Sequence, residues 1–259
     1  TTQADVGQIL RVVASYTDGQ GTPESVPSAD TSAVTNVNDA PTGSVTIDDT
    51  TPAQGQTLTA SNTLADADGL GAITYQWQRA GVDIVGATGS TYTTTQADVG
   101  QILRVVASYT DGQGTLESVP SANTSAVTNV NDAPSGSVTI DDTTPAQGQT
   151  LTASNTLADA DGLGAITYQW QRAGVDIVGA TGSTYTTTQA DVGQILRVVA
   201  SYTDGQGTLE LVPSAGTSAV TNVNDAPTGS VTIDDTTPAQ GQTLTASNTL
   251  ADADGLGAI

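Results

Sequence analysis

Residues 75–105 read YQWQRAGVDIVGATGSTYTTTQADVGQILRV, and this stretch decides the fold of the chain. Its first residues end the segment AITYQWQ, in which apolar and polar residues alternate and place Ile73, Tyr75 and Trp77 on one face. A period of two is typical of a half-buried β-strand. Turn sequences such as RAGVD and GATGS separate this strand from QILRVVASY, which is apolar enough to be a central strand.

Shorter apolar runs lie on both sides of this stretch. GSVTI and QTLTAS precede it and place Val45, Ile47 and Leu58 inward, while TSAVTNV follows it and places Val127 inward. No segment shows a sustained helical period, and turn sequences separate the runs. We therefore predict an all-β fold of about seven antiparallel strands per unit, arranged as an immunoglobulin-like β-sandwich.

The chain is an array of near-identical repeats. TTQADVGQILRVVASYTDGQGT starts at Thr1, Thr94 and Thr187, which gives a period of 93 residues. That period is too long for a solenoid of the ankyrin or leucine-rich type and suits one small domain per repeat. The predicted domains are a C-terminal part of a repeat at 1–40, complete repeats at 41–133 and 134–226, and an N-terminal part at 227–259. Because the chain opens in mid-pattern, we expect a longer array, with part-copies that need complementation or fray.

The composition excludes several kinds of chemistry. The chain has 259 residues, a net charge of −22, no histidine and no cysteine, and all five of its cationic residues are arginines. Without His or Cys it has no Ser–His or Cys–His nucleophile pair, no soft metal site and no disulfide. So acidic a surface repels nucleic acid and anionic lipid, and no apolar run reaches the roughly 20 residues that span a bilayer.

Residues 75–105 resemble the middle of an immunoglobulin-like domain. Trp77 stands where the core tryptophan of strand C stands, and Asp98, Val99 and Gly100 match the Asp-x-Gly corner before strand F. The sequence departs from antibody-type domains because it has no cysteine pair and has Ile102 at the tyrosine-corner position. The core must therefore be held by the packing of Trp77, Tyr75, Leu103, Val105 and their neighbours. The overall likeness is to the immunoglobulin-like and cadherin-like tandem repeats of giant bacterial cell-surface adhesins. It implies an extracellular location, with neighbouring repeats and identical chains of a fibre as partners.

The hexapeptide NVNDAP occurs at 36–41, 129–134 and 222–227. It is similar to the cadherin linker Asp-x-Asn-Asp-x-Pro, and DADG resembles the cadherin Asp-Ala-Asp. The likeness implies calcium at each joint between repeats. The first linker position is Asn129 rather than Asp, and the acidic Asp-Arg-Glu of a preceding cadherin domain is missing.

The expected topology gathers the acidic loops at these joints. In such a sandwich the B–C and F–G loops, here DADG and TDGQG, lie where the chain enters the domain. The A–B and E–F loops, here IDDTTP and QADVG, lie where it leaves. At the first joint the expected ligands are Asn36, Asn38, Asp39, Asp66, Asp68 and Asp111. At the second they are Asn129, Asn131, Asp132, Asp159, Asp161 and Asp204, with Asp48, Asp49 and Asp98 from the earlier domain. At the third they are Asn222, Asn224, Asp225, Asp252 and Asp254, with Asp141, Asp142 and Asp191.

Calcium is the cofactor that this prediction requires. Carboxylates packed together without counter-charge repel one another. Calcium accepts six to eight oxygen ligands in flexible geometry, whereas magnesium keeps its waters more tightly. Each motif also has a purely structural interpretation: TDGQG and IDDTTP as turns, DADG as a solvated loop, NDAP as a spacer, and Asp98 as a cap for backbone amides. Arg79 and Asp83 are expected to form an exposed pair that contributes little.

The predicted function is that of a spacer in a secreted surface adhesin or extracellular fibre, stiffened by calcium at its joints. The alternative is a carbohydrate- or protein-binding adhesive module, which would need an exposed aromatic residue or apolar patch. An enzyme is the weakest hypothesis. Paired carboxylates such as Asp66 and Asp68 could serve glycosidic chemistry, but near-identical copies without a recognisable cleft argue against it.

Overall fold

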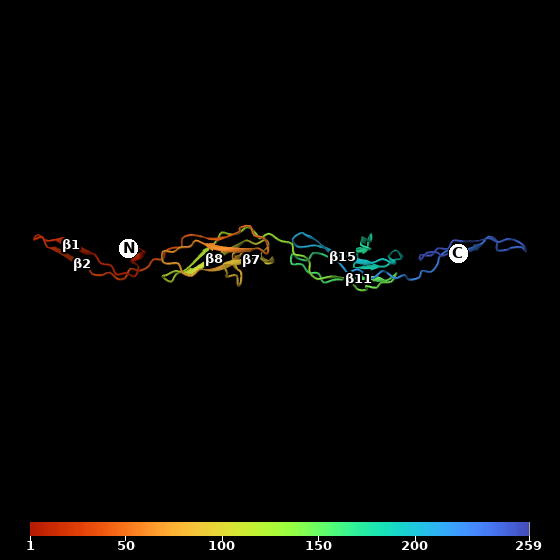
Figure 1. The fold of residues 1–259 in the computed structure, drawn as a ribbon, viewed down its shortest axis with the longest axis horizontal. Helices are drawn as coiled ribbons and strands as arrows, with labels where there is room; N and C mark the ends of the chain where they lie inside the picture. The colour runs from red at the N-terminus through yellow and green to blue at the C-terminus, as the bar shows by residue number, and fades with distance from the viewer. Residues whose placement is uncertain (259) are drawn as a thin grey trace. The chain divides into compact units, whose positions relative to one another are not determined.

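The computed structural model describes residues 1–258, which are built from strands and three single-turn 3-10 helices (Figure 1). They fall into two compact units, 1–130 and 131–258. Each unit holds one complete sandwich and one part-copy. No helix in the described part of the chain is long and apolar enough to cross a membrane.

The complete repeat of the first unit has seven strands in two antiparallel sheets. One sheet has the order β3-β4-β7 and the other β6-β5-β8-β9. Their bounds are β3 Val45–Ile47, β4 Thr57–Asn62, β5 Thr74–Arg79, β6 Val82–Asp83, β7 Thr91–Thr93, β8 Leu103–Thr110 and β9 Leu116–Pro120. The predicted seven-stranded antiparallel sandwich is confirmed.

The second unit repeats this arrangement. Its sheets have the orders β10-β11-β14 and β13-β12-β15-β16. The bounds are β10 Val138–Ile140, β11 Thr150–Asn155, β12 Thr167–Arg172, β13 Val175–Asp176, β14 Thr184–Thr186, β15 Leu196–Thr203 and β16 Leu209–Pro213. The part-copies contribute two hairpins, from β1 Val13–Thr17 with β2 Pro23–Pro27 and from β17 Val231–Ile233 with β18 Ala246–Asn248. The 3-10 helices are η1 Gln3–Asp5, η2 Gln96–Asp98 and η3 Gln189–Asp191.

The core of each sandwich is centred on one tryptophan. Trp77 is fully buried, and every second residue of β8 from Leu103 to Tyr109 is buried. The Trp77 Nε1 donates to the Gly89 carbonyl at 3.0 Å, and its ring lies 5.7 Å from that of Tyr92. Trp170 repeats both contacts in the second unit. The indole is therefore part of the core and is not a sugar-stacking surface.

Asp98 lies inside its own domain and does not face a joint. It is fully buried at the end of η2, and its Oδ1 accepts from Arg79 Nε at 2.7 Å. Its Oδ2 accepts from the Tyr92 hydroxyl at 2.8 Å and the Thr95 amide at 2.7 Å. Asp191 has the equivalent partners. Both carboxylate oxygens are engaged, so we withdraw Asp98 and Asp191 from the predicted ligands.

The expected pair between Arg79 and Asp83 does not form. Arg79 pairs with Asp98 instead, and Asp83 Oδ1 accepts from Gln78 Nε2 at 2.7 Å. The reason is the register of β5 on β8, which sets Arg79 opposite Leu103, close to the end of η2.

We predict that Asp98→Asn lowers the free energy of unfolding of its repeat by about 3 kcal/mol at neutral pH, because Arg79 loses its buried counter-charge. Burial acts to raise the pKa of Asp98, but Arg79, the Thr95 amide and the Tyr92 hydroxyl outweigh it and leave the pKa below 3.8. A carboxylate whose pKa is lowered by folding contributes its full stabilisation at pH values above the ordinary pKa of 3.8. This contribution is lost as the pH falls through the lowered pKa. Urea unfolding of wild type and variant at pH 7 and in acid should therefore converge at low pH. The control is Asp83→Asn, which should keep the wild-type pH dependence.

Candidate metal centre at the joint

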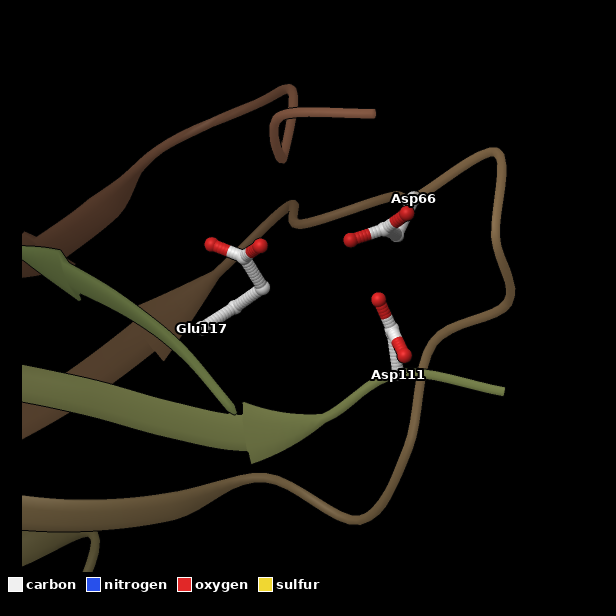
Figure 2. Close-up of side chains that lie close together, drawn as sticks. All are labelled: Asp66, Asp111 and Glu117. Atoms are coloured by element: carbon white, nitrogen blue, oxygen red, sulfur yellow. The ribbon is translucent and has the colours of Figure 1, made fainter. Parts of the chain in front are cut away.

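Three carboxylates meet at the end of each sandwich where the chain enters it. One carboxylate oxygen from each of Asp66, Asp111 and Glu117 lies within 4.8 Å of the others. Asp66 belongs to the loop after β4, Asp111 follows β8, and Glu117 lies on β9. Figure 2 shows the three side chains directed toward a common space. Asp159, Asp204 and Glu210 form the same cluster in the second unit.

The positions of Asp66 and Asp111 are fixed by hydrogen bonds. Asp66 Oδ1 accepts from the Asp68 amide at 2.9 Å, and its Oδ2 accepts from the Tyr109 hydroxyl at 2.6 Å. Burial, followed by the hydrogen bond to Asp66, raises the pKa of Tyr109, so its hydroxyl remains a donor. Asp111 Oδ1 accepts from the amides of Gln113 and Thr115 at 2.9 and 2.7 Å.

The second oxygen of Asp111 is the observation that points to a ligand. Asp111 is 5% exposed, and its Oδ2 is buried without a hydrogen-bond partner. Burial acts to raise the pKa of Asp111, but the Thr115 and Gln113 amides outweigh it, so the pKa is lowered and the group stays ionised. Asp204 Oδ2 is buried and unpartnered in the same way. A buried anionic oxygen without a partner is costly, and a cation bound between the carboxylates would satisfy it.

The two loops that carry the cluster approach each other through glycine. The Gly112 amide donates to the Asp68 carbonyl at 3.0 Å, and a Cβ built on Gly112 would lie 2.5 Å from that oxygen. A Cβ built on Gly71 would lie 2.0 Å from the Thr110 carbonyl. Side chains at these positions would force the loops apart, so DADG and TDGQG place their carboxylates together only because glycine follows.

The linker is tied to the same cluster. Asn38 Nδ2 donates to Glu117 Oε1 at 2.8 Å, and the Asp39 amide donates to Asp68 Oδ2 at 2.7 Å. Asp68 Oδ1 accepts from Gln3 Nε2 at 2.6 Å, which comes from the QADVG loop of the preceding part-copy. Asp68 therefore lies at the predicted joint but anchors the linker, and it is outside the carboxylate cluster.

The linker contacts recur along the chain. Asn131 Nδ2 donates to Glu210 Oε1 at 2.8 Å, and the Asp132 amide donates to Asp161 Oδ2 at 2.7 Å. At the third linker the Asp225 amide donates to Asp254 Oδ2 at 2.8 Å. NVNDAP is thus more than a proline-terminated spacer, because its Asn and Asp residues dock on the next repeat.

We expect Asn38→Ala combined with Asn131→Ala to loosen the linkers without unfolding the sandwiches. Each change removes one exposed hydrogen bond to a carboxylate, worth about 1 kcal/mol, which corresponds to roughly fivefold faster local opening. Amide hydrogen exchange at Asp39 and Asp132 should accelerate by that factor while exchange within β8 and β15 stays unchanged. Unaltered exchange at both linker amides would show that the side chains do not hold the linker.

The predicted ligands Asp48 and Asp49 form a turn within their own domain. Asp48 Oδ1 accepts from the Thr59 amide at 2.7 Å, and Asp49 accepts from the Thr51 amide and Gln56 Nε2, each at 2.7 Å. IDDTTP is therefore a turn, and Asp141 and Asp142 form it again in the second unit. The first asparagine of each linker has few contacts: Asn36 Oδ1 accepts weakly from Gln3 at 3.5 Å, Asn129 Oδ1 is buried without a partner, and Asn222 is exposed. In the third linker Asn224 Nδ2 donates to the Asp225 carbonyl, and Asp225 Oδ2 accepts from Gln147. Asp252 Oδ1 accepts from the Asp254 amide.

Glu117 and Glu210 are the cluster members that the sequence prediction missed. The signal was present, because the chain has only three glutamates, Glu24, Glu117 and Glu210, spaced by one repeat. Glu117 pairs with Tyr109 across the β8–β9 hairpin, which brings it beside Asp66.

The chain is similar to several solved structures of other proteins. No protein-family model matches the chain. No curated protein matches it either. A Ca²⁺-stabilised adhesin that helps an Antarctic bacterium bind ice is 16% identical over 87% of this chain, with a TM-score of 0.30, and the chain spans 59% of it. A tetra-tandem repeat from the extending region of a large adhesion protein is 20% identical over 96% of this chain and 72% of its own, with a TM-score of 0.33.

Immunoglobulin domains 1–4 of Sidekick-1 are 13% identical over 86% of this chain and 60% of their own, with a TM-score of 0.35. The chain is thus similar to bacterial adhesin repeats and to immunoglobulin domains. At such identities and scores the likeness supplies no ligand, so the metal centre depends on the geometry of this chain.

Proposed function

We propose that the complete repeats are non-catalytic extender modules of an extracellular adhesin or fibre, and that calcium stiffens their joints. The observation that carries the proposal is the buried, unpartnered Oδ2 of Asp111, which belongs to a carboxylate cluster that the linker contacts through the hydrogen bond from Asn38 to Glu117. The same oxygen and the same linker contact recur at Asp204, Asn131 and Glu210.

Calcium fits this donor set better than other common ions. Its ligands are all oxygens, and calcium accepts six to eight of them without strict geometry, so water and backbone carbonyls can complete the shell. The absence of cysteine and histidine in the chain removes the ligands that zinc and copper prefer. When bound, the ion would supply the positive charge that offsets three neighbouring carboxylates.

The chain's own residues would transmit this binding to the linker. Glu117 is held by Asn38, and Asp68, whose amide donates to Asp66, accepts from the Asp39 amide. An ion that fixes Glu117 therefore also fixes Asn38, which is hydrogen-bonded to it. An ion that fixes Asp66 fixes Asp68 and, through it, the Asp39 amide. A spacer role is favoured over an adhesive role because, among the described residues of the two complete repeats, no aromatic side chain is exposed.

Small-angle X-ray scattering of the whole chain in calcium and in excess chelator tests the proposal. We expect a longer maximum dimension and a narrower distribution of shapes with calcium, because flexible joints shorten the average end-to-end distance. Glu117→Gln with Glu210→Gln should give the chelated profile under both conditions. Identical wild-type profiles with and without calcium would refute calcium-dependent stiffening, and melting curves would still report whether the sandwiches are folded.

A further inference from the structure

The edge of the larger sheet is left unpaired at Tyr75. Strand β5 pairs with β8 on one side, while on the other side β6 covers only Gln78 and Arg79. At Trp77 the segment after β6 pairs with this edge. The Trp77 amide donates to the Ala87 carbonyl, and the Trp77 carbonyl accepts from the Ile84 amide, both at 2.9 Å. Tyr75 is the next residue whose backbone faces this edge, and within residues 1–258 no hydrogen bond reaches its N–H or C=O.

A groove of about 640 Å³ opens at this position. Tyr75 lines it from β5 and Ile73 from the residue just before β5, while Thr88 and Ser90 line it from the segment that leaves the edge after Ala87. The Tyr75 ring is held in place by Asn62 Nδ2, which donates to its hydroxyl at 2.7 Å. The second unit has the same unpaired edge at Tyr168, with Asn155 on its hydroxyl and Trp170 bonded to Ala180.

Neither proline nor a charged residue protects this edge, although natural sheets usually protect exposed edges in such ways. An unpaired N–H and C=O beside a groove for side chains is the arrangement that binds an extended peptide by strand addition. The segment Ile84–Ala87 shows that the edge accepts main-chain partners, because it does so one step further along β5.

We propose that this groove binds an extended, cationic polypeptide segment of another protein as an added strand. The residues lining the groove are uncharged, while the chain as a whole carries −22. A second copy of the chain would bring the same charge and is disfavoured, whereas a basic segment is attracted. Ile73 lies five positions after Asp68, which belongs to the acidic end of the sandwich. Because a strand rises about 3.3 Å per residue, the residues at one end of a bound peptide would reach that acidic end. This binding surface is separate from the calcium centre and adds a function to the spacer.

Nuclear magnetic resonance of the whole chain in saturating calcium tests the proposal. The probe is a synthetic peptide of alternating threonine and valine with two lysines at each end. We expect it to shift the amide resonances of Tyr75 and Tyr168 and to slow their hydrogen exchange about tenfold. The same peptide N-methylated at its central valine cannot donate there, and it should lose this effect.

Variants separate strand addition from simple charge attraction. Thr88→Arg with Thr181→Arg puts a cation into the groove wall and should weaken peptide binding about tenfold. Thr46→Arg with Thr139→Arg makes the same charge change on an exposed face of the other sheet and should leave binding unchanged. Shifts confined to Asp66, Asp111 and Glu117, or equal shifts with the N-methylated peptide, would overturn the proposal. Concentration-dependent shifts at Tyr75 without peptide would also overturn it, in favour of a second copy.

Discussion

Asp111→Asn combined with Asp204→Asn should abolish the rise in melting temperature that calcium gives the wild-type chain. Asparagine keeps the Oδ1 that accepts from the loop amides, but replaces the unpartnered Oδ2 with an NH₂ group that cannot bind a cation. At free calcium a hundredfold above Kd, a bound ion stabilises its repeat by about 2.7 kcal/mol, which is roughly 10 °C or more for a domain of this size.

Without calcium the same variant should melt at or slightly below the wild-type temperature, because the lowered pKa values of Asp111 and Asp204 mean that their ionised forms stabilise the fold. A lost ligand is therefore recognised by the lost increment with calcium, measured for each chain against its own melting temperature without calcium. Asp83→Asn with Asp176→Asn makes an equal charge change at an exposed hairpin and should keep the full response to calcium. A double variant at Asp111 and Asp204 that still gains the wild-type increment would place the ion elsewhere.

Trp77→Ala should lower the free energy of unfolding of the first complete repeat by about 4 kcal/mol. The change empties a fully buried site, removes the hydrogen bond to the Gly89 carbonyl and ends the ring contact with Tyr92. The remaining tryptophan, Trp170, then reports only the second complete repeat. Its fluorescence in urea should keep the wild-type midpoint while circular dichroism shows an additional early transition.

Trp170→Ala is the matched control. In this variant the second complete repeat should unfold early, and the fluorescence of Trp77 should keep the wild-type midpoint. If each variant instead shifted both transitions equally, the two sandwiches would not have separate cores, contrary to the packing around Trp77 and Trp170.

The strands could be predicted because they depend on local sequence pattern. The alternation through Tyr75 and Trp77 and the run in 103–110 both became strands with the inward residues expected. The loops could be predicted because Asp-Gly and Asn-Asp-x-Pro turns restrict backbone conformation locally. The expected topology of an immunoglobulin-like sandwich then placed Asp66, Asp111 and the linker residues Asn38 and Asp39 at one end of the domain, where they lie.

The ligand set was predicted less well because it depends on pairings between distant segments. Asp98 meets Arg79 only through the register of β5 on β8 and the capping geometry of η2. Glu117 reaches the cluster only through the hairpin that pairs it with Tyr109. Asp48 and Asp49 illustrate the opposite case, since hydrogen bonds from residues no further along the chain than Thr59 use their oxygens. An acidic residue in a loop is therefore a weak predictor of a ligand until its own amide partners are known.

Calcium titration by isothermal calorimetry of the whole chain, against Glu117→Gln with Glu210→Gln, measures the centre most directly. If the account is correct, the wild type binds one ion for each of the clusters around Asp111 and Asp204, and the variant loses that heat while its sandwiches remain folded. Absence of saturable binding in the wild type, or equal binding in the variant, would contradict it.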